Sequence, residues 1–240
     1  SSMQTIGTAE IAGFKTIDKE TFILTLKAPV PPGFEPGDAL ENLTWSPDLK
    51  VSGNRFGSCR ARGLLVSTPG KVVIENNTFE SSGSAILICG DANYWYESGA
   101  VTDVLIQNNT FTDLCNTSSY QFCEGIISVY PEIPEMNAKS GQFHRNITIT
   151  GNTFHPFDYP VLFAKSVDGI IFSNNKLIKS NRFEPYHNRK YTFTFEGCKN
   201  IGLENNIFEG EILGKNVLLK HTPALELKYS TDQNLTVKVD

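Results

Sequence analysis

Charged and aromatic side chains gather in one short stretch that follows an apolar run ending at Gly90. Two arginines precede the corresponding apolar run of the preceding repeat. This constellation consists of Arg60, Arg62, Asp91, Tyr94, Trp95, Tyr96 and Glu97. Aromatic rings pack on the apolar faces of pyranose rings, while carboxylates and guanidinium groups bind the hydroxyls. The constellation therefore predicts a sugar-binding site, in which the arginines and the three aromatic residues contact the sugar.

Asp91 and Glu97 are the candidate catalytic residues of this site, with Asp91 as the first choice. Two carboxyl groups on either side of a glycosidic bond can serve as acid and base, ~6.5–9.5 Å apart in enzymes that invert the anomeric configuration. Structural roles compete with this interpretation. Asp91 is also typical of a turn, and the two arginines would then pair with Glu80 or Glu41.

Later repeats add two residues to the predicted groove. Glu132 and Lys165 stand at comparable positions after or within apolar runs, and we predict that they also bind the substrate. The four histidines are scattered and the five cysteines form no CxxC pair, so the spacing of a metal site is missing. We therefore expect neither a metal nor another cofactor.

The element that must position these residues is a repeated nine-residue unit. Its copies read DLKVSGNRF, KVVIENNTF, DVLIQNNTF, NITITGNTF, GIIFSNNKL and NIGLENNIF. They close on Phe56, Phe79, Phe111, Phe154, Leu177 and Phe208. Each copy is a short alternating strand followed by Asn-Asn or Gly-Asn, residues that tolerate the left-handed backbone of a sharp corner. We expect the amides to form a ladder and the closing residues to stack inside.

A second apolar run lies outside this unit in most repeats, at residues 63–68, 85–90, 125–130, 160–165 and 192–197. Two or three short strands per repeat with Asn-rich corners are typical of a parallel β-helix. The predicted fold is all-β: a right-handed, single-stranded parallel β-helix of about seven coils. A β-sandwich is the alternative, but it does not predict the same corner in every repeat.

The first residues do not fit the repeat. Alternating runs at 8–17 and 21–26 around Asp18 and Lys19 predict an antiparallel hairpin, and a Pro- and Gly-rich stretch follows. We therefore divide the chain into a small β module at 4–36 and a β-helix at 37–240.

Three insertions interrupt the repeat, at residues 90–99, 131–145 and 179–190. Function in a solenoid is concentrated in such loops. All three follow or adjoin the second apolar run, so we expect them to rise on one side and to wall a groove.

Composition restricts the function classes. The chain has 240 residues and a formal net charge of −5, and it has no basic cluster, which argues against a nucleic-acid surface. No apolar run approaches eighteen residues, so a membrane span is not predicted.

These motifs together resemble glycoside hydrolase family 110. The resemblance is carried by GD at 37–38, LEN at 40–42, RARG at 60–63, KVVIENN with Phe79, AILI before GD at 85–91, Trp95 and Glu97. It implies an exo-acting α-1,3-galactosidase of the type that removes the blood-group B galactose, inverting and without a metal, on a right-handed β-helix interrupted by a small β-barrel.

The same resemblance implies a longer protein, of which this chain would be the C-terminal portion and residues 4–36 the end of the inserted barrel. It also implies a galactose-terminated glycan as partner and a periplasmic or extracellular location. A homodimer stays open, and the chain alone is expected to bind sugar without necessarily hydrolysing it. A non-catalytic glycan-binding module and a purely structural solenoid are the alternative functions.

Overall fold

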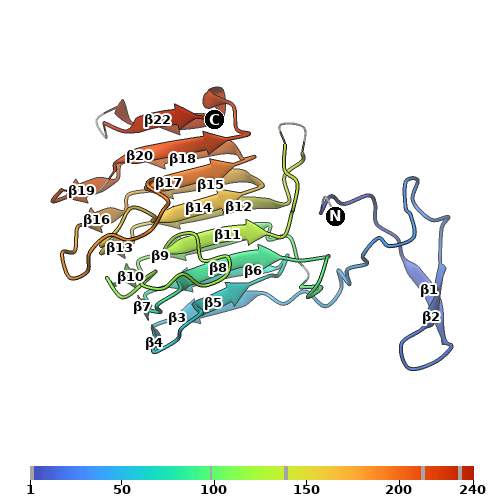
Figure 1. Cartoon of the computed structure of the whole chain (residues 1–240). Helices are drawn as coiled ribbons and strands as arrows, with labels where there is room; N and C mark the ends of the chain where they lie inside the picture. The colour runs from blue at the N-terminus through green and yellow to red at the C-terminus, as the bar shows by residue number, and fades with distance from the viewer. Residues whose placement is uncertain (1–2, 98, 138–139, 212–213, 232–233) are drawn as a thin grey trace.

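The computed structural model describes residues 3–97, 99–137, 140–211, 214–231 and 234–240. Within these residues the chain forms twenty-two β-strands and one 3₁₀ turn at Ala224–Glu226, so it is all-β. Twenty strands form three parallel sheets, and almost every strand pairs with the strand three positions further along the chain. The three sheets rise together from the early strands to the late ones (Figure 1), an arrangement consistent with a parallel β-helix.

The three sheets follow one another along each repeat. The first sheet comprises β3 (Leu49–Ser52), β6 (Lys71–Glu75), β9 (Asp103–Gln107), β12 (His144–Thr150), β15 (Val167–Ser173), β18 (Lys199–Glu204) and β21 (Leu227–Tyr229). The second comprises β4 (Arg55–Gly57), β7 (Thr78–Glu80), β10 (Thr110–Phe111), β13 (Thr153–Phe154), β16 (Lys176–Ile178) and β19 (Ile207–Glu209). The third comprises β5 (Arg62–Val66), β8 (Ser84–Gly90), β11 (Ile127–Pro131), β14 (Leu162–Lys165), β17 (Phe193–Glu196), β20 (Asn216–Lys220) and β22 (Thr236–Val239).

An asparagine ladder closes the corner between the first and second sheets, as the repeat predicts. Each ladder amide after the first accepts the backbone N–H of the ladder residue one repeat earlier; Asn77 N donates to Asn109 Oδ1 at 2.9 Å, and Asn109 N donates to Asn152 Oδ1 at 2.9 Å. The residue before each ladder asparagine has a positive φ, for example 55° at Asn76. The ladder consists of Asn54, Asn77, Asn109, Asn152, Asn175 and Asn206.

The closing residues of the repeats lie in register inside the stack, which confirms the predicted column. The rings of Phe56, Phe79, Phe111 and Phe154 follow one another with centroids 4.5–5.1 Å apart and nearly parallel planes. Leu177 continues the register, and Phe208 ends it. Together with inward Ile, Val and Leu side chains from the first and third sheets, this column forms one continuous buried core.

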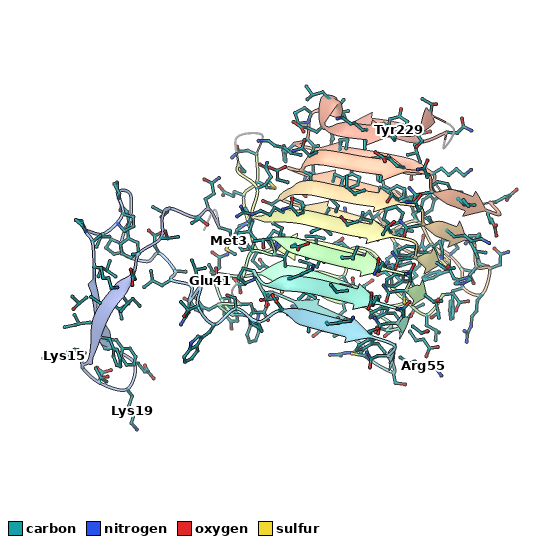
Figure 2. All side chains as sticks on the ribbon, turned by 180° about the vertical axis from the view of Figure 1, so that it is seen from behind. Met3, Lys15, Lys19, Glu41, Arg55 and Tyr229 are labelled. Carbon is teal, nitrogen blue, oxygen red and sulfur yellow. The ribbon has the colours of Figure 1, made fainter. Side chains whose placement is uncertain are left out.

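β1 (Ile11–Thr16) and β2 (Phe22–Leu26) pair antiparallel, so the predicted hairpin is present. The hairpin, with Lys15 and Lys19, lies apart from the stacked strands (Figures 1 and 2). The stacked strands begin at Leu49 in β3, with no strand described between β2 and β3. None of the described segments forms a helix with the length and apolarity that a membrane crossing needs.

Candidate functional site

Four insertions flank the third sheet, two at each end of its strands (Figure 1). Residues 91–102 follow β8 and residues 132–143 follow β11, at the carboxyl ends. Residues 179–192 precede β17, at the amino ends, so the expectation that all three predicted insertions rise on one side is wrong. The cause is topological: the third insertion replaces the corner that enters the third sheet, whereas the first two replace the corner that leaves it. Ser98 and residues 138–139, within the predicted insertions, lie outside the described residues.

Asp91 begins the insertion after β8 and is only 3% exposed. Its Oδ1 accepts the backbone N–H of Asn93 at 2.6 Å, and its Oδ2 accepts that of Trp95 at 2.5 Å. Tyr94 N–H also donates to this carboxylate at 3.1 Å. Burial by itself would raise the pKa of Asp91, but these N–H groups outweigh it and lower the pKa. The carboxylate is therefore ionised and shapes the loop.

The aromatic residues of this loop reach into solvent. Tyr94, Trp95 and Tyr96 are 75%, 69% and 70% exposed. The Tyr94 and Trp95 rings meet edge to face with centroids 5.1 Å apart. Since Asp91 holds the Tyr94 and Trp95 backbone, the sequence places exposed rings on a fixed turn, which is what stacking against a sugar requires.

Glu97 closes the loop onto the sheet. The Glu97 backbone carbonyl accepts the N–H of Asp91 at 2.8 Å, and the Cys89 thiol donates to Glu97 Oε2 at 3.2 Å. Burial, followed by the bond and charge of Glu97, raises the pKa of Cys89, and the positive charge of Arg62 opposes this shift. Arg62, Asp91 and Glu97 thus lie within electrostatic range of one thiol.

Arg60 and Arg62 also contact an insertion that the sequence interpretation missed. Their guanidinium carbons lie 5.0 and 5.3 Å from the centre of the Tyr120 ring. Neither forms an ion pair with Glu80 or Glu41 in the described part of the chain; Glu80 pairs with Arg55 instead. This insertion, residues 112–126, is not among the three that the sequence predicts, although its Tyr120 and Phe122 are a signal that could have identified it.

Glu132 and Lys165 extend the carboxyl-end cluster across the next strands. Lys165 is buried, donates from Nζ to the Ile133 carbonyl at 2.7 Å, and lies 5.0 Å from the Tyr130 ring centre. Burial lowers the pKa of Lys165, while the charges of Glu196 and Glu132 oppose the shift. Burial and then the Asp91 charge raise the pKa of Glu132, and Lys165 opposes this. Asp91 after β8, Glu132 after β11 and Lys165 at the end of β14 therefore share one charged face.

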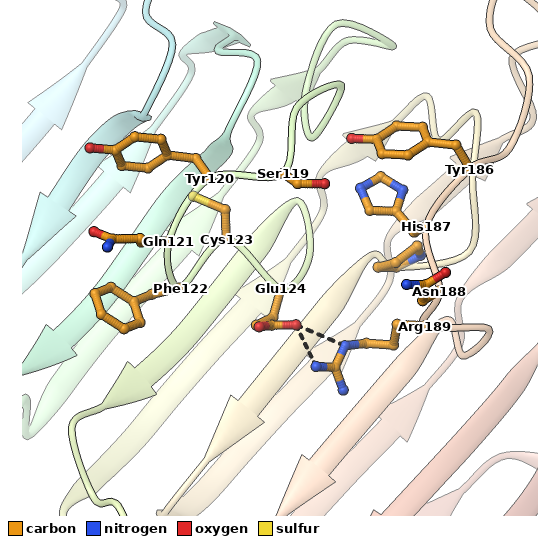
Figure 3. A pocket seen from close by; sticks show the side chains of 11 residues that line it. Ser119, Tyr120, Gln121, Phe122, Cys123, Glu124, Tyr186, His187, Asn188 and Arg189 are labelled. Atoms are coloured by element: carbon orange, nitrogen blue, oxygen red, sulfur yellow. Dashed lines mark hydrogen bonds and ion pairs between the residues drawn. The ribbon is translucent and has the colours of Figure 1, made fainter.

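A pocket lies at the other end of the same strands (Figure 3). It has a volume of about 510 Å³. Residues 119–124 and 186–189 line it, together with Pro160. The two segments are joined by Arg189, whose Nε donates to Glu124 Oε2 at 3.0 Å. Arg60 and Arg62 contact this end through Tyr120, while the charge of Arg62 also acts on Cys89. Arg60 is therefore placed at the amino ends of the strands, and Arg62 lies between the two clusters.

The described residues hold no group of three His, Cys, Asp or Glu side chains that could bind a metal ion. All five cysteines are free thiols. Burial raises the pKa of Cys115 and Cys198 to about 12 in each case, so these two are protonated members of the core.

Curated proteins similar to this chain carry one kind of name. "Alpha-1,3-galactosidase B" of Bacteroides thetaiotaomicron is 53% identical over 99% of this chain and 38% of its own length. "Alpha-1,3-galactosidase B" of Parabacteroides distasonis is 40% identical over 91% of this chain and 37% of its own length. "Alpha-1,3-galactosidase A" of Bacteroides fragilis is 36% identical over 95% of this chain and 38% of its own length.

No protein-family model matches the sequence. The chain spans less than two fifths of the length of these three relatives, but it matches them over nearly all of its own residues. The matched region of the first relative covers 99% of this chain and so includes both the repeats and the insertions. The chain therefore belongs to the family that its motifs resemble, glycoside hydrolase family 110, that of the proteins named alpha-1,3-galactosidase.

Proposed function

We propose that this chain is part of a glycoside hydrolase that removes terminal α-linked galactose from glycans. The observation that carries the proposal is the 53% identity, over 99% of the chain, to a protein named alpha-1,3-galactosidase B. The exposed rings of residues 94–96 beside a cluster of carboxylates support it, because this combination suits a sugar ring. The partner is then a galactose-terminated glycan, held on a right-handed solenoid of about seven coils, in a periplasmic or extracellular setting.

The proposed mechanism is an inverting displacement with one carboxyl group as acid and another as base. Glu132 suits the acid, because burial and the charge of Asp91 raise its pKa. Glu97 is the proposed partner carboxylate. Asp91 has the ionised form that a base needs, yet its oxygens already accept three backbone N–H groups. We therefore assign Asp91 to hold the aromatic loop and to help burial raise the pKa of Glu132.

The sugar contacts follow from the same arrangement. The rings of Tyr94, Trp95 and Tyr96 are proposed to pack on the galactose. Arg62 and Lys165 are proposed to stabilise the carboxylates and to bind hydroxyl groups. Arg60, which lies against Tyr120, is proposed to contact the glycan at the amino ends of the strands.

The test is the release of galactose from an α-1,3-linked galactoside by the polypeptide that contains this chain. Glu97→Gln and Glu132→Gln are each expected to lower kcat/KM by about a hundredfold or more, the loss typical for a general acid or base. Glu135→Gln is the matched control, since Glu135 is an exposed glutamate in the same insertion as Glu132.

Three outcomes decide the matter. Unchanged kcat/KM in both variants refutes the residue assignment. Saturable glycan binding without any hydrolysis by the intact polypeptide favours the non-catalytic module. Neither binding nor hydrolysis leaves the structural solenoid.

A further inference from the structure

The pocket at the amino ends of β11, β14 and β17 has a lining of its own and adjoins the charged face around Glu97 and Glu132 through Tyr130, whose ring lies 5.1 Å from that of Phe122 in the pocket and 5.0 Å from Lys165 Nζ on that face. It lies between two insertions, one before β11 and one before β17, whereas Glu97 and Glu132 follow the carboxyl ends of β8 and β11. A volume of about 510 Å³ lies within the range of small-molecule sites, ~300–1,000 Å³. The pocket is therefore large enough for a ligand of its own.

The wall of this pocket is fixed by one buried carboxylate. Asp158 Oδ2 accepts the backbone N–H groups of Tyr186 and His187, each at 2.8 Å, and the ring Nδ1 of His187 at 2.6 Å. Its side chain is 2% exposed. Burial alone would raise the pKa of Asp158, but the bonds from His187, Tyr159 and Tyr186 lower it, so the group is ionised. A pre-formed wall loses little conformational entropy when a ligand binds, so the cost of binding is smaller.

Glu124 and Arg189 are, with His187, the acidic and basic residues that line the pocket, whereas Arg60 and Arg62 contact Tyr120 without lining it. Nε and a terminal nitrogen of Arg189 both bond Glu124 Oε2, so Oε1 of that carboxylate receives no bond from Arg189 (Figure 3). The guanidinium also lies 4.8 Å from the Phe163 ring centre. One carboxylate and one guanidinium in a fixed pair favour a neutral ligand with hydroxyl groups over an anion or a cation.

Rings and side-chain amides complete the lining. Tyr120 and Tyr186 bring aromatic rings from the two insertions, and Tyr186 is 45% exposed. Gln121 and Asn188 add amide groups, which can donate hydrogen bonds to hydroxyl groups and accept them.

We propose that this pocket is a second sugar-binding site, which takes a neutral pyranose unit of a glycan other than the galactose that is removed. The choice of a glycan as the ligand rests on the proposed function; the choice of a neutral, hydroxyl-rich ring rests on the pocket itself. Tyr186 packs on the ring, and the Glu124–Arg189 pair binds its hydroxyls. The site holds a further unit of the same glycan.

The test uses the 240-residue chain and a galactose-terminated oligosaccharide, with binding followed by NMR titration. Tyr186→Ala is expected to weaken binding by about tenfold, and Tyr186→Phe to retain it, because the ring and not the hydroxyl carries the contact. Tyr229→Ala is the matched control: Tyr229 is 40% exposed and lies in β21 of the first sheet, near the last strands (Figure 2). A chemical-shift map must place the ligand on residues 119–124 and 186–189.

A second readout separates this site from the catalytic proposal. In the polypeptide that contains this chain, Tyr186→Ala should raise KM for the oligosaccharide by about tenfold and leave kcat/KM for a simple aryl α-galactoside unchanged. Shift changes confined to the Glu97 and Glu132 end, or equal weakening by Tyr186→Ala and Tyr229→Ala, would overturn the second site. If aryl galactoside hydrolysis is absent while the oligosaccharide still binds this pocket, the proposed function fails and the second site stands.

Discussion

The corner between the first and second sheets and the insertions beside the third sheet use the same residue types in opposite ways. In the corner, Asn109 is buried, and its amide bonds the repeats before and after it. In the insertions, Asn188 is exposed and lines a pocket. The corner repeats one arrangement along the whole stack, so its contribution to stability adds from repeat to repeat. The insertions repeat nothing, and there a residue can be selected for binding.

The largest expected difference between the two regions is for aromatic residues. Phe111→Ala removes a ring stacked between Phe79 and Phe154 and should lower the free energy of unfolding by about 3–5 kcal/mol. Trp95→Ala should change it by less than about 0.5 kcal/mol, because that ring is in solvent. Urea denaturation measures both. Similar losses in the two variants would break the contrast.

Asparagine gives the next comparison. Asn109→Ala leaves the buried N–H of Asn77 and the carbonyl of Ile74 without their partners, which should cost about 2–3 kcal/mol. Asn188→Ala should stay within about 0.5 kcal/mol of the parent protein. A small effect at Asn109 would mean that water replaces the ladder amide.

His144 tests the stack through pH. It begins β12, is fully buried, and accepts the Val101 N–H at Nδ1 over 3.2 Å; burial lowers its pKa to about 3. The unfolded chain takes up this proton near pH 6.5 and the folded chain does not. The free energy of unfolding is therefore not reduced by His144 above about pH 6.5. It should fall by roughly 1.4 kcal/mol per pH unit between about 6.5 and 3.

The control is His144→Asn, which keeps an acceptor for Val101 and does not titrate. The difference in unfolding free energy between the parent and this variant should change with pH by that slope. A parallel pH dependence of the two proteins contradicts the assignment.

The smallest expected effect on stability is in the insertions. Glu124→Gln weakens the bond to Arg189, but both side chains are about one third exposed, so the loss should be under about 1 kcal/mol. Glycan binding to the pocket should fall by much more than stability does. If Glu124→Gln lowered the free energies of binding and of unfolding by the same amount, Glu124 would have a structural role only.

Prediction from sequence succeeded where one local rule repeats. Gly-Asn and Asn-Asn before an aromatic residue define a left-handed corner, and the structure has positive φ at Gly53, Asn76, Asn108 and Gly151. It failed for the side of the third insertion, because residues 179–190 enter the third sheet where the other two leave it. It also missed residues 112–126, because the contacts of Tyr120 with Arg60 and Arg62 join segments far apart in the sequence.

The sequence by itself determined the repeat, its buried column and its amide ladder, since these depend on residue types at fixed spacing. Only the tertiary structure decided which insertions meet. Arg189 and Glu124 are 65 residues apart and pair because β11 and β17 each adjoin β14 in one sheet. Likewise, the sequence does not predict that three backbone N–H groups donate to the Asp91 carboxylate, because these hydrogen bonds depend on the path of the backbone.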